Sequence, residues 1–304
     1  MKSIKKVFDI SFLILSFLVF ILILVSCNRD SEGFVFEESE STATVIGYKG
    51  RNEHIVIPSS YNGKPVTAIG ENAFYKHYNK RIIRSAIIPS TVKIIGGGAF
   101  GYCAELNSIV IPNSVTCIGS WAFVCCGFET VDIPGSVECL EHGVFYACRS
   151  LTTVNIGEGV RVIEEQAFQD CTSLESISLP DSIERVEGYL TFKDTPWYAK
   201  LEENRKGKLI YIGKTLYDYN YCHDWVINIR DDIVFIKDWA FAYHQDVRAI
   251  RIPKSVLMIG YGAFSSKYSN LITVYYEGTK EQWNNIKICG GNEPLLNATI
   301  QYNE

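Results

Sequence analysis

The sequence predicts an elongated solenoid, an α/β-type but β-rich right-handed superhelix of about eight stacked coils with one parallel sheet. The first observation behind this prediction is an Ala-Phe pair, or a close variant, that recurs about every 23 residues. The second is a proline, or a substitute, that stands at a fixed distance before most of these phenylalanines. The third is a pair of aliphatic residues just before that proline. The phenylalanines are Phe74, Phe100, Phe123, Phe145, Phe168, Phe192, Phe241 and Phe264.

Residues 106–123 show how one unit forms a coil. Ile109 and Ile111 are two positions apart, so their side chains point to one face of a short strand. Pro112 cannot donate to a strand ladder and therefore ends the strand. The Val-x-x-Ile segment that follows supplies a second inward-facing corner, and Phe123 closes the coil and fills the core.

A coil of about 23 residues cannot bury its own apolar face, whereas stacked coils bury it continuously. Each coil then contributes one strand to a parallel sheet. The period lies in the range of about 20–29 residues, and the units start with a Leu-x-x-Leu-x-Leu-like pattern, both of which are typical of leucine-rich repeats. The sequence therefore predicts a leucine-rich-repeat solenoid.

The repeated pattern Ile-Pro-x-Ser-Val-x-x-Ile-Gly-x-x-Ala-Phe-x-x-Cys resembles the repeat of the BspA-type leucine-rich-repeat family. The copies that carry this resemblance are residues 88–103, 111–126, 133–148 and 156–171. The chain departs from the pattern at Gly157 and Arg230, which stand in the proline slot, and at Gly143-Val144, in the Gly-x-x-Ala slot. The resemblance implies an exported or surface protein, because most family members are exported or lie at the surface and several act as adhesins toward host proteins.

The resemblance covers residues 34–304, and its ends and interruption can be read separately. Residues 34–50 precede the first unit as an N-terminal cap would, and residues 271–304 resemble the family's C-terminal cap. Residues 195–219 resemble a hairpin insertion, and we place the whole insertion at about 193–226. Within it, Gly213-Lys214 lies between two apolar alternating runs and suits a two-residue type II′ turn. In the C-terminal cap, Thr279 to Gln282 forms a capping-box pattern for a short helix.

The N-terminus predicts a lipoprotein signal peptide at residues 1–26, followed by a polar tether at 27–33. Three lysines precede an uncharged apolar run at residues 10–25. As a helix this run is about 24 Å long, short of the roughly 30 Å hydrocarbon core of a bilayer. It ends in Leu-Val-Ser-Cys27, which resembles the bacterial lipobox, so we predict lipid attachment at Cys27. An uncleaved anchor helix with an incidental cysteine is the alternative. The predicted location is the cell envelope, lipid-anchored at the outer membrane or cell surface.

Composition excludes several classes of protein. The formal net charge is −5, which gives no basic footprint for nucleic acid. Apolar residues make up 47% and charged residues 21%, as in folded globular chains rather than disordered ones. No nucleophile, metallopeptidase or nucleotide-loop pattern stands out, so we predict no enzymatic activity and no cofactor.

The ten cysteines fall mostly into columns. Cys103, Cys126, Cys148 and Cys171 each stand three residues after a repeat phenylalanine. On stacked coils such a column is a straight line with steps of about 4.8 Å, which cannot surround a metal ion tetrahedrally. We therefore predict a ladder of buried thiols at a coil corner and no metal site.

The strand face opposite the core is the first candidate ligand surface. Positions that flank the inward residues of each strand are rich in small polar side chains, and the alternative is that these only pair along the ladder. The candidates are Ser85, Ser108, Thr130, Asp132, Thr153, Asn155, Ser176, Ser178, Asn228 and Arg251.

The second candidate surface is the aromatic-rich region around the insertion. Half or more of its aromatic side chains belong to the core, and Trp197, Tyr217 and Tyr219 are the candidate recognition anchors if their side chains are exposed. From all these features we predict a non-enzymatic cell-envelope lipoprotein that presents its repeat surface to a host or envelope protein, for binding or adhesion. A glycan-binding accessory lipoprotein that uses the insertion aromatics, and a structural scaffold, stay open as alternatives. We predict no nucleic-acid partner, and membrane contact through the lipid anchor alone.

Overall fold

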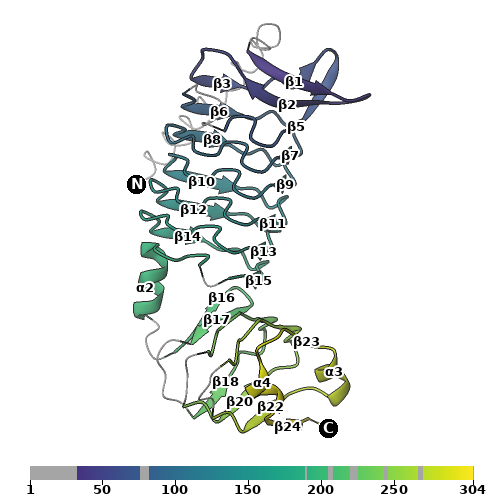
Figure 1. The fold of residues 1–304 in the computed structure, drawn as a ribbon, viewed down its shortest axis with the longest axis vertical. Helices are drawn as coiled ribbons and strands as arrows, with labels where there is room; N and C mark the ends of the chain where they lie inside the picture. Colours follow the sequence, from purple (N-terminus) through teal and green to yellow (C-terminus); the bar gives the residue numbers. More distant parts are fainter. Residues whose placement is uncertain are drawn as a thin grey trace, which may run out of the picture.

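The computed structural model is an elongated solenoid, and it describes residues 33–75, 82–188, 190–204, 208–219, 225–242, 246–265 and 270–303 (Figure 1). Within these residues, ten short parallel strands, one from each coil, form the first row. They are β3 (His54–Val56), β6 (Ser85–Ile87), β8 (Ser108–Val110), β10 (Thr130–Ile133), β12 (Thr153–Ile156), β14 (Ser176–Ser178), β18 (Val226–Asn228), β20 (Ala249–Ile252), β22 (Thr273–Tyr276) and β24 (Thr299–Tyr302). The predicted solenoid is confirmed, but it has about ten coils rather than eight. Strands β22 and β24 belong to coils that lack the Ala-Phe pair.

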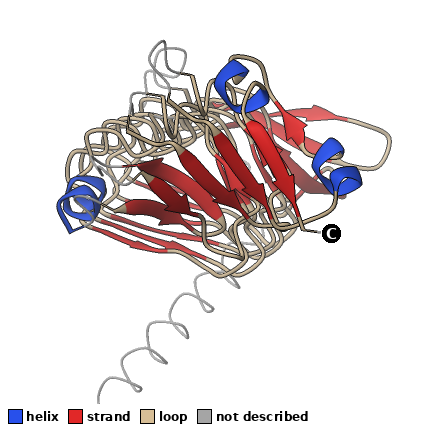
Figure 2. Cartoon of the chain, turned by 90° about the horizontal axis from the view of Figure 1, so that it is seen from below, coloured by secondary structure: helices blue, strands red, loops and turns tan. Residues whose placement is uncertain are grey.

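A second row of parallel strands runs beside the first, so the expectation of a single parallel sheet is wrong. The row consists of β5 (Lys64–Ile69), β7 (Ile94–Ile95), β9 (Cys117–Ile118), β11 (Cys139–Leu140), β13 (Val162–Ile163), β15 (Arg185–Val186), β17 (Thr215–Tyr219), β19 (Phe235–Ile236), β21 (Met258–Ile259) and β23 (Lys287–Ile288). Most of these strands are the predicted second corner, where the backbone is extended for only two residues. Stacking in register pairs each with its counterpart, for example Ile95 with Ile118. Seen along the solenoid, the helices lie at the margins of the strand rows (Figure 2).

Phenylalanines form a stack through the core. Phe100, Phe123, Phe145 and Phe168 are fully buried. Successive rings lie 5.5–5.6 Å apart with interplanar angles of 8–14°. The stack reaches Phe192, whose ring is 5.7 Å from that of Phe168. Since each ring covers its neighbour, the core is continuous from coil to coil, as the repeat predicts.

The chain turns through the left-handed region at two points of nearly every coil. Nine non-glycine residues with positive φ fall into two columns. One column lies just before the Ala-Phe slot and includes Trp121 and Gln166, and the other lies two residues after the phenylalanine and includes Asp170. Gly143, at φ 61°, occupies the first column, and a Cβ there would lie 2.5 Å from the Trp121 ring. Gly143 is therefore in its normal slot, and Glu141 is the residue that replaces the usual glycine.

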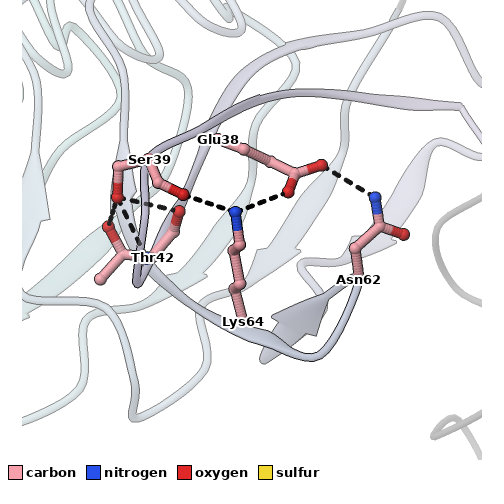
Figure 3. A network of polar contacts seen from close by, with 5 residues as sticks. All are labelled: Glu38, Ser39, Thr42, Asn62 and Lys64. Atoms are coloured by element: carbon pink, nitrogen blue, oxygen red, sulfur yellow. Dashed lines mark hydrogen bonds and ion pairs between the residues drawn. The ribbon is translucent and has the colours of Figure 1, made fainter.

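The N-terminal cap is an antiparallel hairpin of β1 (Phe34–Glu38) and β2 (Ala43–Tyr48), and β2 extends the second row through β5. Strand β4 (Ser60–Tyr61) pairs with the start of β5. The Lys64 ammonium fastens the hairpin to the first coil, with Nζ 3.0 Å from a Glu38 carboxylate oxygen and 2.5 Å from the Ser39 carbonyl (Figure 3). The amide of Asn62 donates to the other Glu38 oxygen at 2.8 Å. These hydrogen bonds lower the pKa of Glu38, the one from Lys64 most.

The C-terminal cap adds the short helices α3 (Lys280–Asn284) and α4 (Glu293–Leu296). The predicted capping box is confirmed. The Thr279 hydroxyl accepts from the Gln282 N–H, and the Gln282 side chain accepts from the Thr279 N–H at 2.9 Å. Trp283 and Leu295 turn inward from these helices and are buried, which closes the apolar end of the solenoid.

The insertion consists of helix α2 (Pro196–Asn204) and the antiparallel hairpin of β16 (Leu209–Ile212) and β17. Gly213, at φ 57°, makes the predicted turn between the two strands. Sequence reasoning missed α2, although Thr195 followed by Pro196 is a start signal: the Thr195 hydroxyl accepts from the Tyr198 N–H at 3.2 Å. Strand β17 pairs with β19, so the hairpin begins the C-terminal part of the second row, in a sheet separate from that of β15. Among the described residues, no helix has the length and apolarity that a membrane span requires.

Candidate functional site

The ten predicted ligand-face residues all lie on the first row of strands, and six of them come together on β10, β12 and β14. Thr130, Thr153 and Ser176 form one line of paired positions, and Asp132, Asn155 and Ser178 form the next. We call these six residues the polar ladder. Five are exposed, and Thr153 is half-buried. The Asn155 amide donates to the Asp132 carboxylate at 2.7 Å, so part of the ladder is tied together.

The other four candidates lie outside the polar ladder. Ser85 and Ser108 are paired on β6 and β8, nearer the N-terminal cap. Asn228 and Arg251 are paired on β18 and β20, beyond the insertion. Arg251 reaches Glu277 at 3.6 Å and lies over the Tyr275 ring, 5.6 Å from its centre. The structure thus places all ten on one row, in three groups.

The three predicted aromatic anchors do not form an exposed platform, and for Tyr217 and Tyr219 the expectation of exposure is wrong. Each of these two side chains is only 1% exposed. Tyr217 packs 6.0 Å from Phe192, and Tyr219 packs 5.4 Å from Phe241, as measured between ring centres. They therefore cover the two ends of the phenylalanine stack on either side of the interruption. Trp197 is half-buried against Phe192 at 4.9 Å.

Between α2 and β17 lies a cavity of about 810 Å³, which we call the α2 cleft. In Figure 1, α2 lies beside the coil of β14, with the β16–β17 hairpin below it. Tyr198 on α2 and Asp218 on β17 face each other across the cleft, with the phenol donating to Asp218 Oδ2 at 3.3 Å. Burial raises the pKa of Tyr198, and the Asp218 carboxylate raises it further. Burial also raises the pKa of Glu202, one turn along the helix.

Lys237 lies at the inner end of the α2 cleft and is only 4% exposed. The register that pairs Leu216 with Ile236 places Lys237 beside Tyr217, and the ammonium lies 4.3 Å from the centre of the Tyr217 ring. Within the described ranges, this ammonium has no hydrogen bond and no ion pair. Burial lowers the pKa of Lys237 to about 8, although Asp218, Asp238 and Glu165 partly oppose the shift.

Sequence reasoning placed a candidate surface in this region but missed the groups that form the α2 cleft: Tyr198, Glu202, Asp218 and Lys237. A signal for Lys237 was present. It directly follows the inward aliphatic residue of the second corner, where the other coils with a repeat phenylalanine have glycine or glutamate. The equivalent residues are Gly70, Gly96, Gly119, Glu141, Glu164, Glu187 and Gly260. A lysine in this column is out of pattern, but its burial could not be deduced from one sequence.

The predicted cysteine ladder is confirmed. Cys103, Cys126, Cys148 and Cys171 are buried thiols, each between 0% and 4% exposed. Each thiol donates to the phenylalanine carbonyl of the preceding coil, at 3.0–3.3 Å from sulfur to oxygen. Burial raises the pKa of Cys171 to about 12, and it raises the pKa of Cys126 and Cys148 well above its ordinary value. Within the described part of the chain, no group of three or more His, Cys, Asp or Glu residues is placed to hold a metal ion.

The predicted lipid-attachment residue Cys27, the signal peptide and all of the tether but Gly33 lie outside the described residues.

Stacked coils with two strand rows and a phenylalanine core define a leucine-rich-repeat protein. The BspA-type leucine-rich-repeat region matches residues 54–196 and 206–286 in six copies, so the chain belongs to that family. No curated protein matches the chain.

Several solved structures are similar to this chain. A leucine-rich cell surface protein from Faecalibacterium prausnitzii is 22% identical, with a TM-score of 0.44, and the match covers 84% of this chain and 96% of that one. The leucine-rich repeat protein of T. pallidum is also 22% identical, with a TM-score of 0.44 and coverage of 58% and 94%. The pneumococcal vaccine antigen PcpA is 17% identical, with a TM-score of 0.49 and coverage of 80% and 70%.

Proposed function

We propose that this protein is a non-enzymatic cell-envelope lipoprotein that binds another protein, from the host or the envelope, through the polar ladder. The observation that carries the proposal is the exposure of these in-register side chains on three adjacent strands. Membership of the BspA-type family supports a repeat surface as the working part of the chain.

The shape of this face favours a macromolecular ligand. Strands β3 to β14 are six neighbours on the first row, and at about 4.8 Å per strand they present a surface about 24 Å long. The polar ladder lines no cavity among those described, and its side chains stand in lines rather than converging on a point. An extended surface of this kind suits a protein partner better than a small molecule, which needs a concave site.

The test of the binding face is a matched pair of charge reversals in one coil. Asp132→Lys alters the polar ladder, whereas Glu138→Lys makes the same charge change at an exposed residue beside the second row. We expect Asp132→Lys to reduce capture of the partner in pull-downs with host matrix proteins and envelope extracts, and Glu138→Lys to leave it intact. Equal loss in both variants would contradict a ladder-specific role.

The proposed anchor is a lipid on Cys27, and its test is separate from that of the binding face. We expect Cys27→Ala to abolish acylation and to release the protein from the membrane fraction. Membrane retention with residues 1–26 still attached would instead identify an anchor helix. Protease treatment of intact cells tests the location, because cleavage only after lysis would move the protein inside the envelope and exclude adhesion.

A further inference from the structure

The α2 cleft is a built site that the polar ladder does not use. Its volume of about 810 Å³ is in the range of pockets that take small ligands. It opens on the side where the insertion interrupts the first row of strands, between α2 and the paired strands β17 and β19. Ligand binding here is independent of the protein-binding role proposed above.

Among the described residues, the ammonium at the inner end of the α2 cleft has no directly paired anion. Lys237 is 4% exposed, and its ammonium lies 4.3 Å from the centre of the Tyr217 ring but, among the described residues, makes no hydrogen bond or ion pair with the nearby carboxylates of Asp218, Asp238 and Glu165. A buried charge is costly unless it is paired and hydrogen-bonded. Because this cation lines the cavity, a ligand that carries a carboxylate would supply the missing partner.

The α2 cleft also carries a group of hydrogen-bond acceptors. Asp218 and Glu202 line it from two sides, and Asp194 stands at its rim. Ionised carboxylates only accept hydrogen bonds, so a matching ligand needs several hydroxyl groups here. Trp239 also lines the cleft and is 40% exposed, and Tyr261 holds its ring edge-on at 5.3 Å between ring centres. A flat apolar surface that is fixed in this way suits the C–H face of a sugar ring.

From these three observations we propose that the α2 cleft binds a short acidic oligosaccharide through a hexuronic acid unit. The sugar carboxylate pairs with the Lys237 ammonium, its hydroxyls donate to Asp218 and Glu202, and one sugar ring covers Trp239. A neutral sugar would leave Lys237 without an anion. The carboxyl end of a peptide would pair with Lys237 but would offer few donors to the acidic rim.

The test is calorimetric titration of the full-length chain with three probes. The first is a disaccharide of glucuronic acid and N-acetylglucosamine, the second is the methyl ester of that disaccharide, and the third is a tripeptide with a free carboxyl end. We expect saturable binding of the acid, at least tenfold weaker binding of its ester, and no binding of the peptide. Equal binding of acid and ester, preference for the peptide, or no binding of any probe would overturn the proposal.

Two variants connect the binding to this site. Lys237→Met keeps the apolar stem and removes the charge, and we expect it to weaken binding of the acid at least tenfold. Lys93→Met makes the same change at an exposed lysine in an N-terminal coil and should leave binding within twofold. If Lys237→Met does not fold, Glu202→Gln provides the second reading, with an expected loss of several-fold. Wild-type affinity in both folded cleft variants would refute the assignment. Loss of protein capture by the polar ladder would leave this result untouched.

Discussion

Two regions of the molecule cover the apolar core with different side chains: the regular coils between Phe74 and Phe192, and the insertion that follows them. In the regular coils, each phenylalanine covers the next, and the thiols of the cysteine ladder satisfy carbonyls of the preceding coil. In the insertion, Tyr217 and Tyr219 replace phenylalanine at the two broken ends of the stack. The buried core therefore divides into two clusters at the interruption, with Tyr217 in the first and Tyr219 in the second.

The two regions also differ in how they accommodate a charged residue directly after the inward aliphatic residue of the second corner, a position that is glycine in several coils. Glu141 and Glu164 bury part of their carboxylates, but each accepts a backbone N–H of the preceding coil, from Ser120 at 2.8 Å and from His142 at 2.9 Å. Lys237, in the same column, has no such partner within the described residues. A charged residue at this position is thus structural where the neighbouring coil provides a hydrogen-bond partner, as for Glu141 and Glu164. It points to a ligand where the described residues provide none, as for Lys237.

Removing a ring from the phenylalanine stack should break the regular coils most severely. Phe145 is fully buried between Phe123 and Phe168. We expect Phe145→Ala to lower the free energy of unfolding by about 3–5 kcal/mol, because it removes apolar contacts and leaves a cavity. Urea denaturation followed by circular dichroism measures this. Phe145→Leu, which keeps most of the volume, should cost clearly less, and an equal cost would mean that the stacked ring itself, rather than the filled volume, carries the stability.

Removing the charge of Lys237 should instead raise the free energy of unfolding at neutral pH. Its pKa is about 8 in the folded protein and 10.5 ordinarily, so below pH 8 the buried charge opposes folding by about 3 kcal/mol. As the pH rises from 8 to 10.5 the folded protein loses this proton first, and the penalty disappears. We expect Lys237→Met to be more stable than wild type at pH 7, with the difference shrinking toward pH 10.5. Thermal unfolding across this pH range measures the effect, and a destabilised variant at pH 7 would contradict it.

A change in the cysteine ladder should have a smaller effect. Cys148→Ala removes one buried sulfur, and the Phe123 carbonyl keeps its hydrogen bond from the Cys126 N–H. We expect a loss of about 1 kcal/mol, with or without reductant. In the native wild-type protein, the ladder thiols should react slowly with iodoacetamide and the half-buried Cys289 faster. Rapid alkylation of the ladder would show that these thiols are not packed.

The polar ladder should contribute least to stability. Asp132 is exposed, and its described side-chain partner is the equally exposed Asn155. We expect Asp132→Ala to leave the unfolding temperature unchanged within error, because an exposed polar pair gains little over its contacts with water. Differential scanning calorimetry measures this. A clear loss of stability would favour the alternative that these side chains only stabilise the strands.

Particular residues show why some features could be predicted and others could not. The thiol ladder follows from spacing alone, because equal spacing in a solenoid becomes a straight column. The two-residue strands of the second row carry no periodicity of their own, so their pairing emerges only when coils are stacked. In the sequence, Tyr217 and Tyr219 resemble surface aromatic residues. In the structure, both lie on β17, where the phenylalanine stack is interrupted, and their rings pack against Phe192 and Phe241.

By itself the sequence determined the repeat, its inward-facing residues, both caps and the hairpin, because each depends on contacts between residues close in the chain or one period apart. Only the tertiary structure decided the number of coils, the second strand row and the α2 cleft. The cleft joins a helix, a strand and turns that are separated by up to 67 residues, from Thr172 to Trp239. The burial of the Lys237 charge depends on that whole assembly, since removing a charge from water requires neighbours on every side.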